Sequence, residues 1–163
     1  MSRRFSIEVE KDYFNFASAH FLIFPNNQRE PLHGHNYQVS VTVEGELDRT
    51  GVVLNFITFK PLVKKVCDEL DHRTLIQSDN PILKVRQDRR SVQVLYKDQR
   101  LILPRRDVIL LPLVNTSTEL LAEYIARKIR RRTLRQFPGA KLHFIEVSIN
   151  ETIGQRGVFR GEF

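Results

Sequence analysis

Large apolar residues alternate with polar residues over residues 5–20, which is the pattern of a half-buried β-strand. They occupy odd positions up to Val9 and even positions from Phe14 onward. Because a shift of one residue exchanges the two faces of a strand, we expect a β-bulge near residues 11–13. After the shift, His20 falls on the same face as Phe14, just beyond the end of the strand.

A second alternating segment runs over residues 34–47, after a polar, turn-rich loop at residues 25–31. His33 and His35 have the parity of the apolar residues that follow them, so they begin the face that becomes hydrophobic. Both imidazoles can therefore reach one point, and His20 joins them if the loop folds the chain back.

Two segments have the 3.6-residue spacing of amphipathic helices. The first carries an apolar stripe over residues 59–70, and we place Pro61 near its first turn, where proline is tolerated. The second starts where Thr116 and Glu119 have the spacing of a capping box, and it ends before Pro138.

The C-terminal segment returns to strand alternation, with residues 143–151 pairing back onto residues 158–163. Glu151 ends an otherwise apolar face, where a carboxylate needs a partner, either an arginine such as Arg156 or a ligand with N–H donors. Between residues 80 and 112, two alternating runs flank a polar turn, so we expect a hairpin insert there.

Composition sets the class of protein. The 163 residues, 41% of them hydrophobic, are enough for one core, so we expect residues 1–163 to form a single domain. No apolar run has the length of a membrane span and the charged N-terminus is unlike a signal peptide, so we expect a cytoplasmic protein. The single cysteine, Cys67, excludes an intramolecular disulfide and a cysteine-based zinc cluster, and we expect it to be buried in the first helix.

The formal net charge of +7 raises nucleic acid as a partner. The chain has no tryptophan, helix-turn-helix signature or RNA-binding aromatic pattern, so we expect neither nucleic acid nor membrane as a partner. A basic nucleic-acid partner built on an enzyme scaffold is the alternative. The same charge suits a small anionic substrate such as a phosphate ester.

Three histidines and an Asp-His pair carry the candidate chemistry. Neutral imidazoles of His20, His33 and His35 around a metal ion would leave its fourth position open, which is typical of catalytic zinc. Asp71 and His72 follow the first helix. An aspartate next to a histidine is either surface polarity or a means of orienting the imidazole for proton transfer.

The order of elements and five short motifs resemble one enzyme family. The motifs are SAHFL, LHGHNY, LDHRTL, TSTELL and NETIGQRGVFRGE. In this order they are similar to the 6-pyruvoyl-tetrahydropterin synthase family, including its 6-carboxy-tetrahydropterin synthase branch, over nearly the whole chain except residues 80–112. The resemblance implies an α+β tunnelling fold, in which a four-stranded antiparallel sheet carries two helices on one face. It also implies that subunits join their sheets into a barrel, as a homo-hexamer of two trimers.

The resemblance also implies roles at the matching positions. The residues that match the family's Zn²⁺ ligands are His20, His33 and His35. Asp71 and His72 match its proton-transfer pair, and Glu151 matches the carboxylate that anchors the pterin ring. The residues that match the wall of the pterin pocket are Ser117, Thr118 and Glu119.

The chain departs from the family pattern at one place. Synthases that make the pyruvoyl or carboxy product usually carry a catalytic cysteine four residues before the first histidine of H-G-H, where this chain has Arg29. Cys67 cannot replace that cysteine, because it belongs to the predicted helix. Glu30 comes next, and E-P-L-H-G-H resembles the subgroup in which glutamate is the catalytic base; otherwise Glu30 is an exposed loop acid.

The resemblance therefore implies a zinc-dependent lyase that acts on 7,8-dihydroneopterin triphosphate. In the glutamate subgroup the side chain is cleaved to give 6-hydroxymethyl-7,8-dihydropterin, a folate precursor, and we expect this activity. The alternatives are a 6-pyruvoyl- or 6-carboxy-tetrahydropterin synthase, and a protein that binds pterin without turning it over.

Overall fold

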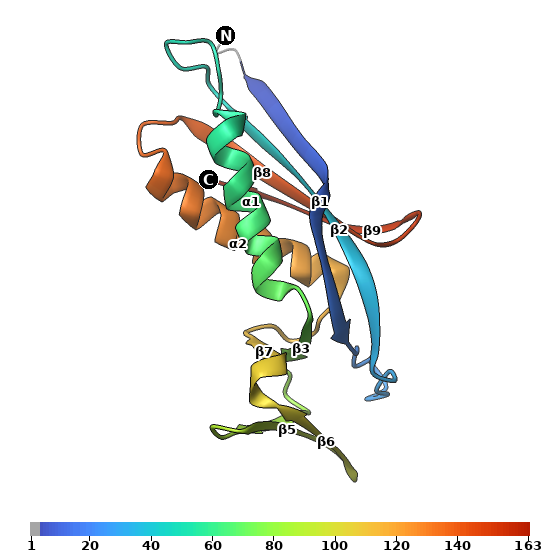
Figure 1. Cartoon of the computed structure of the whole chain (residues 1–163). Helices are drawn as coiled ribbons and strands as arrows, with labels where there is room; N and C mark the ends of the chain where they lie inside the picture. The colour runs from blue at the N-terminus through green and yellow to red at the C-terminus, as the bar shows by residue number, and fades with distance from the viewer. Residues whose placement is uncertain (1–3) are drawn as a thin grey trace. The chain divides into compact units, whose positions relative to one another are not determined.

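The structure, a computed structural model, describes residues 4–163 (Figure 1). The chain divides into two compact units. Unit 1 comprises residues up to 16, 36–69 and 118–163, and unit 2 comprises residues 17–35 and 70–117. Strands β1 (Phe5–His20) and β2 (His33–Gly45) each have residues in both units.

Unit 1 consists of a sheet in the order β1-β2-β8-β9 with two helices on one face (Figure 1). Its other elements are α1 (Phe56–Leu70), α2 (Thr118–Gln136), β8 (Leu142–Thr152) and β9 (Gln155–Glu162). β2 pairs antiparallel with β8, and β8 pairs antiparallel with β9. The predicted α+β class, the two helices and the C-terminal hairpin are confirmed.

The core of unit 1 follows from the alternation of its strands. Val41 of β2 pairs with Val147 of β8, and both side chains are fully buried. In β1, Val9 is buried on one parity and Phe14 on the other, which confirms the predicted change of face. Cys67 is buried in α1, as expected for a small hydrophobic residue.

Helix α1 begins earlier than its apolar stripe predicted. The Asn55 side-chain oxygen accepts the Ile57 N–H at 2.8 Å, and the Asn55 carbonyl accepts the Phe59 N–H at 2.9 Å. These are the bonds of an N-terminal cap. The placement of Pro61 near the first turn is therefore wrong, because the cap starts the helix at Phe56 and leaves Pro61 inside it.

Unit 2 contains strands that the expected four-stranded antiparallel sheet does not include. β3 (Arg73–Gln77) pairs in parallel with the end of β1 and with β7 (Val108–Leu111), so parallel strands extend the expected four-stranded antiparallel sheet. A separate three-stranded sheet has the order β4-β5-β6. Its strands are β4 (Lys84–Gln87), β5 (Ser91–Tyr96) and β6 (Gln99–Pro104), followed by the short helix η1 (Arg105–Asp107). The β5–β6 hairpin is the one expected in the insert, and β4 was missed.

The small sheet has its own hydrophobic core. Val92, Val94 and Tyr96 of β5 pack in one cluster with Phe21 and Ile23. The insert therefore buries the segment that directly follows His20. No helix within residues 4–163 has the length and apolar character needed to cross a membrane.

An ion-pair network joins α1 to α2 in unit 1. Glu69 pairs with Lys128 at 2.6 Å and with Arg132. Burial alone would raise the pKa of Glu69, but the two cations outweigh it and hold that pKa below its ordinary value of 4.5. A depressed carboxyl pKa stabilises the fold above the unfolded-state pKa, and this contribution is lost as the pH falls through the folded-state value.

We therefore expect Glu69→Gln to lower the free energy of unfolding by about 1–2 kcal/mol at pH 7. The difference from the parent should shrink as the pH falls below 4.5. Glu123→Gln is the control, because Glu123 pairs with an Arg127 side chain that is 73% exposed. Its effect should stay within about 0.5 kcal/mol. Urea unfolding from pH 7 to pH 3 measures both, and equal effects of the two variants would contradict a specific role for Glu69.

Candidate functional site

Three histidines of unit 2 converge on one point. His20 ends β1, and His33 and His35 begin β2. Their ring centroids are 4.7, 5.3 and 4.7 Å apart, and the rings are inclined by 53° to 88° rather than stacked. One ring nitrogen from each lies within 4.8 Å of those of the other two. Three ring nitrogens this close together could all bind one metal ion.

Gly34 allows the two strands to approach closely at the histidines. A side chain at Gly34 would place its Cβ 3.2 Å from the Ser18 carbonyl oxygen, which belongs to rigid backbone. His20 is 1% exposed, while His33 and His35 are half-buried. The glycine of H-G-H thus brings two partly accessible imidazoles opposite a buried one.

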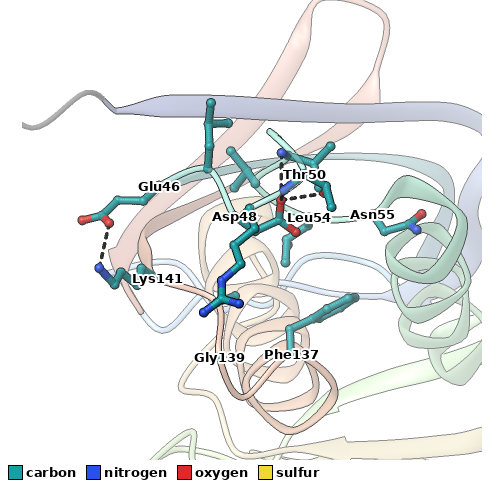
Figure 2. Close-up of a pocket in the computed structure, with 13 residues that line it drawn as sticks. Glu46, Asp48, Thr50, Leu54, Asn55, Phe137, Gly139 and Lys141 are labelled. Carbon is teal, nitrogen blue, oxygen red and sulfur yellow. Dashed lines mark hydrogen bonds and ion pairs between the residues drawn. The ribbon is translucent and has the colours of Figure 1, made fainter.

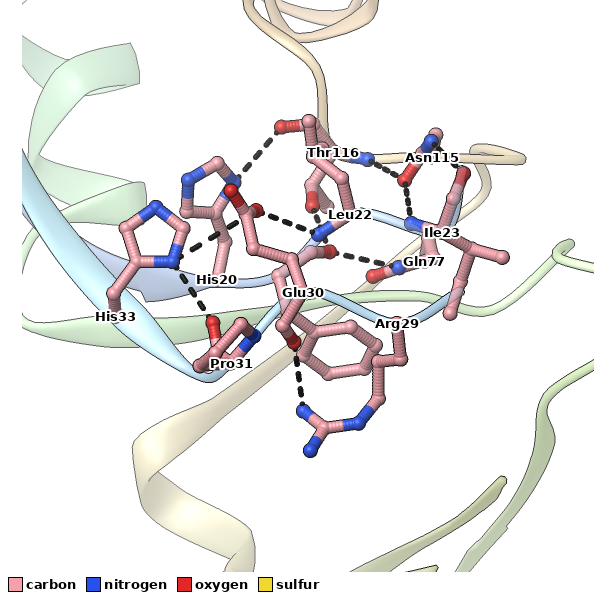
Figure 3. A network of polar contacts seen from close by, with 11 residues as sticks. His20, Leu22, Ile23, Arg29, Glu30, Pro31, His33, Gln77, Asn115 and Thr116 are labelled. Atoms are coloured by element: carbon pink, nitrogen blue, oxygen red, sulfur yellow. Dashed lines mark hydrogen bonds and ion pairs between the residues drawn. The ribbon is translucent and has the colours of Figure 1, made fainter. Parts of the chain in front are cut away.

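Backbone carbonyls set the tautomers of two of these rings. Nδ1 of His20 lies 3.0 Å from the Thr116 carbonyl, and Nδ1 of His33 lies 2.9 Å from the Pro31 carbonyl (Figure 3). A carbonyl oxygen only accepts, so each Nδ1 carries a hydrogen, and in the neutral tautomer that results the lone pair lies on Nε2. The Nε2 lone pairs of His20 and His33 are then free to bind a divalent metal ion, and His35 fits as the third ligand.

Buried polar side chains hold the chain after His20. The Thr116 hydroxyl donates to the Phe21 carbonyl at 3.0 Å, and the Gln77 amide donates to the same oxygen at 2.9 Å. Asn115 accepts from the Ile23 N–H and donates to the Ile23 carbonyl (Figure 3). Helix α2 begins at Thr118, so Ser117 rather than Thr116 directly precedes it, and the predicted capping box from Thr116 to Glu119 is displaced from the helix start.

Thr116 and Asn115 are functional residues that sequence reasoning missed. An Asn-Thr pair after an apolar run indicates the start of a helix. Nothing in these two residues signals a contact with the segment after β1, which lies more than 90 residues away in the sequence. Only the fold reveals that Thr116 orients His20.

The Glu30 carboxylate lies beside His33. One oxygen, Oε2, accepts the Leu22 N–H at 3.1 Å and lies 3.8 Å from His33 Nδ1 (Figure 3). Its side chain is 27% exposed, so it is neither a fully solvated loop acid nor a buried one. The structure therefore brings Glu30 together with the histidine cluster, although the sequence of the loop is polar throughout.

Asp71 and His72 attach the end of α1 to β1. Asp71 Oδ1 accepts the Ala17 N–H at 2.8 Å, and its Oδ2 lies 2.8 Å from His72 Nδ1. Burial acts to raise the pKa of Asp71, but the hydrogen bonds from Ala17 and His72 outweigh it and lower that pKa. His72 has a φ of 55° and a largely exposed side chain, so the imidazole is oriented by Asp71 but open to solvent.

The candidate pterin residues Glu151, Thr118 and Glu119 lie in unit 1, and Ser117 ends unit 2. Glu151 is the extra residue of a β-bulge, because Asn150 pairs with Arg156 and Thr152 pairs with the next residue back, Gln155. Bulges often redirect a side chain next to a functional site. Glu151 is half-buried there.

Strand β9 passes very close to the start of α2. A Cβ at Gly157 would lie 2.6 Å from the backbone of Thr118 and Glu119, so only glycine fits. Gly157 pairs with Ile149 of β8, two residues before Glu151. Within unit 1 the fold thus brings the start of α2 toward the strand that carries Glu151.

A hollow of about 870 Å³ in unit 1 is not a candidate active site (Figure 2). Asp48, which lines it, accepts hydrogen bonds from the Thr50 hydroxyl and N–H and from the Val52 N–H. Lys141 pairs with Glu46 at 3.1 Å. These polar groups satisfy one another and stabilise the loop, so we assign them no chemistry.

Comparison with known proteins places this geometry in one family. The family model described as 6-pyruvoyl tetrahydropterin synthase matches residues 8–162. A protein of Methanocaldococcus jannaschii, provisionally named 6-carboxy-5,6,7,8-tetrahydropterin synthase, is 36% identical over 148 residues, which cover 89% of this chain and 88% of that protein.

Two further proteins resemble the chain. The dihydroneopterin monophosphate aldolase of Pyrococcus furiosus is 47% identical over 68 residues, covering 41% of this chain and 57% of that enzyme. A solved Plasmodium vivax 6-pyruvoyltetrahydropterin synthase, with alanine in place of a catalytic glutamate, has a TM-score of 0.91 at 27% identity and covers 99% of this chain and 100% of that chain.

The histidine cluster predicts a metal site that can be tested with Co²⁺. We expect the protein to bind a single Co²⁺ per chain with the intense visible absorption of a tetrahedral site, and His33→Ala to abolish that absorption, because two ligands and solvent do not hold the geometry. His143→Ala is the control, since His143 lies in β8 of unit 1. Full Co²⁺ stoichiometry and an unchanged spectrum in His33→Ala would refute the ligand assignment.

Proposed function

The chain belongs to the 6-pyruvoyl tetrahydropterin synthase family, and on that premise we propose that it is a zinc-dependent lyase that cleaves the side chain of 7,8-dihydroneopterin triphosphate. The products are 6-hydroxymethyl-7,8-dihydropterin and a two-carbon aldehyde that keeps the phosphate groups. The observation that carries this proposal is the Glu30 carboxylate, which lies 3.8 Å from His33 Nδ1 in a loop without cysteine.

Two relatives each support one part of this proposal. The P. furiosus relative is named as an aldolase for a dihydroneopterin phosphate, and the P. vivax structure is named for the replacement of a catalytic glutamate. Both names concern those proteins. For this chain the aldolase name supports cleavage of the side chain. The P. vivax name supports a glutamate as a catalytic residue, and the pyruvoyl and carboxy reactions are the alternatives that the product assay separates.

His20, His33 and His35 are the proposed Zn²⁺ ligands. Three imidazole nitrogens are a common catalytic set for zinc, which is softer than the oxygen-preferring Mg²⁺ and Ca²⁺. When bound, Zn²⁺ supplies Lewis acidity that lowers the pKa of a coordinated substrate hydroxyl and stabilises developing negative charge. The protein contributes the tautomers of His20 and His33 and the partly exposed positions of His33 and His35.

Glu30 is the proposed general base. It removes the proton of the side-chain 2′-hydroxyl, the oxygen electrons form the C2′ carbonyl, and the bond between C1′ and C2′ breaks. The electron pair left on C1′ is delocalised into the dihydropterin ring and then takes up a proton. We assign transfer of that proton to Asp71 and His72, whose 2.8 Å contact orients the imidazole.

Glu151 is the proposed anchor of the pterin ring, because its carboxylate can accept two N–H groups from the ring edge. The residues proposed to line the ring are Ser117, Thr118 and Glu119. The enzyme is further proposed to work in the cytoplasm as a homo-hexamer, without nucleic acid or membrane as a partner. β9 is an edge strand of its sheet, and assembly into a barrel would cover such an edge.

A dihydroneopterin monophosphate is the second candidate substrate, because of the similarity to the P. furiosus aldolase. Both substrates give the same pterin product by the same cleavage, and they differ only in the phosphate groups of the aldehyde. A pterin binder without turnover is the alternative that uses none of this chemistry.

The test of the function is to incubate the zinc-loaded protein separately with 7,8-dihydroneopterin triphosphate and monophosphate. We expect 6-hydroxymethyl-7,8-dihydropterin from at least one of them, identified by chromatography and mass spectrometry. The ratio of the two kcat/KM values identifies the preferred ester. A 6-pyruvoyl or 6-carboxy product, or binding without turnover, would overturn the proposal.

Glu30→Gln should lower kcat by about 10²–10⁴-fold, because glutamine has the shape of glutamate but cannot accept the hydroxyl proton. Zinc content and pterin affinity should not change. Glu30 also contacts His33, so a role limited to orienting that ligand predicts the reverse pattern, with weaker zinc binding and activity restored by excess Zn²⁺. Steady-state kinetics together with zinc titration separates the two roles.

A further inference from the structure

The segment that carries Glu30 is a small hairpin within unit 2. Ile23 bridges to Arg29, and the Phe24 N–H donates to the Gln28 carbonyl at 2.9 Å. The Glu30 N–H then donates to the Leu22 carbonyl at 2.9 Å. Its tip is polar and exposed, so these few backbone bonds alone are a weak constraint on the catalytic carboxylate.

The β5–β6 hairpin of the insert holds this segment from outside. The Tyr96 hydroxyl donates to the Asn27 carbonyl, and the Gln99 side-chain oxygen accepts from Arg29 Nε at 2.9 Å. Tyr96 and Gln99 are paired residues that flank the turn of the hairpin. Tyr96 is also part of the buried cluster of the insert, so its hydroxyl is presented by a packed side chain.

Arg29 connects the insert to the backbone of Glu30. Its Nη1 donates to the Glu30 carbonyl at 2.9 Å (Figure 3). Its Nε bonds to Gln99, and its guanidinium carbon lies 5.3 Å from the centroid of the Phe21 ring. A planar guanidinium makes such contacts at the same time, because its donors point in fixed directions and its face stacks on aromatic rings.

Together these contacts fix Glu30 at three places. The Glu30 N–H donates to the Leu22 carbonyl, and the Glu30 carbonyl accepts from the Arg29 guanidinium. The Glu30 carboxylate accepts from the Leu22 N–H at 3.1 Å. We propose that Arg29, anchored by Gln99 in a segment that Tyr96 holds at Asn27, is a positioning residue that holds the Glu30 carboxylate at the histidine cluster. The insert thereby serves catalysis without touching the substrate. This inference rests on the proposed role of Glu30 as the base.

The test compares four variants of the zinc-loaded full chain. Arg29→Ala removes the guanidinium. Arg29→Lys keeps the positive charge but loses the planar set of N–H donors. Gln99→Ala removes only the bond between Gln99 and Arg29 Nε. Arg100→Ala is the matched control, because Arg100 is exposed on the same hairpin and its side chain reaches Gln93 at 3.4 Å rather than the catalytic segment.

The kinetic expectation is a loss in kcat. Arg29→Ala and Arg29→Lys should each lower kcat by about 10-fold, with KM within about twofold, since small misplacement of a catalytic group is costly. Gln99→Ala should lower kcat by about threefold, and Arg100→Ala should leave it unchanged. A rise in KM that grows with the number of substrate phosphates, at unchanged kcat, would overturn the proposal and make Arg29 a phosphate contact.

A double-mutant cycle tests whether Arg29 acts through Glu30. Once Glu30 is glutamine, adding Arg29→Ala should change the residual rate by less than about twofold, because the base that Arg29 positions is already absent. A full further loss of about 10-fold would show that Arg29 acts independently, and would overturn the proposal.

Hydrogen exchange of the Leu22 amide provides a readout that needs no turnover. This N–H donates to the Glu30 carboxylate, so its exchange rate reports how often that hydrogen bond is formed. Arg29→Ala should accelerate it by about 5–10-fold, while Arg100→Ala should not. If the parent protein does not cleave the pterin but the amide responds, the proposed function fails and the positioning stands; an unchanged amide overturns the positioning.

Discussion

The hydrogen bonds from His20 and His33 to backbone carbonyls are the constraint on which the candidate site depends. A neutral imidazole has one N–H and one lone pair, so a carbonyl that binds the Nδ1 hydrogen also decides where Nε2 points. The carbonyl for His20 belongs to Thr116, and the carbonyl for His33 belongs to Pro31. The candidate metal site is therefore formed only when three separate segments of backbone are in place.

Much of unit 2 can be understood as support for those segments. Gln77 and Thr116 are completely buried, and each donates to the Phe21 carbonyl. Burying a polar group costs free energy unless the group is hydrogen-bonded. Here the cost is offset, because the two side chains bond to the backbone of a segment that has left β1 and has no strand partner for that carbonyl. The insert adds the apolar cover, since Phe21 and Ile23 lie in its hydrophobic cluster. Phe21 directly follows His20, so the packing of the insert on Phe21 and Ile23 also influences the position of the His20 ring.

How far the sequence predicts this structure depends on the range of the interactions. Alternation is a local signal, and it predicted the long strands, the change of face between Val9 and Phe14, and the H-x-H pair on one side of β2. β3 was missed because RTLIQ is short and does not alternate, and its pairing with β1 in parallel depends on chain far away. Thr116 was assigned to a helix cap because the local pattern fits one. Its real partners are 95 and 96 residues away, and no spacing encodes them.

Alternation also explains why position 30, rather than position 29, faces the histidines in this chain. Adjacent residues of an extended segment point to opposite sides, so the bridge between Ile23 and Arg29 directs Arg29 toward Gln99 and Glu30 toward His33. A thiol at position 29 on this backbone would face the insert. The glutamate side chain has one more rotatable bond than an aspartate and two more than a cysteine, so holding its carboxylate in one place costs more conformational entropy. With Glu30 in its proposed role, a loop that uses glutamate needs more external contacts than one that uses cysteine, and in our proposal the β5–β6 hairpin supplies them through Arg29.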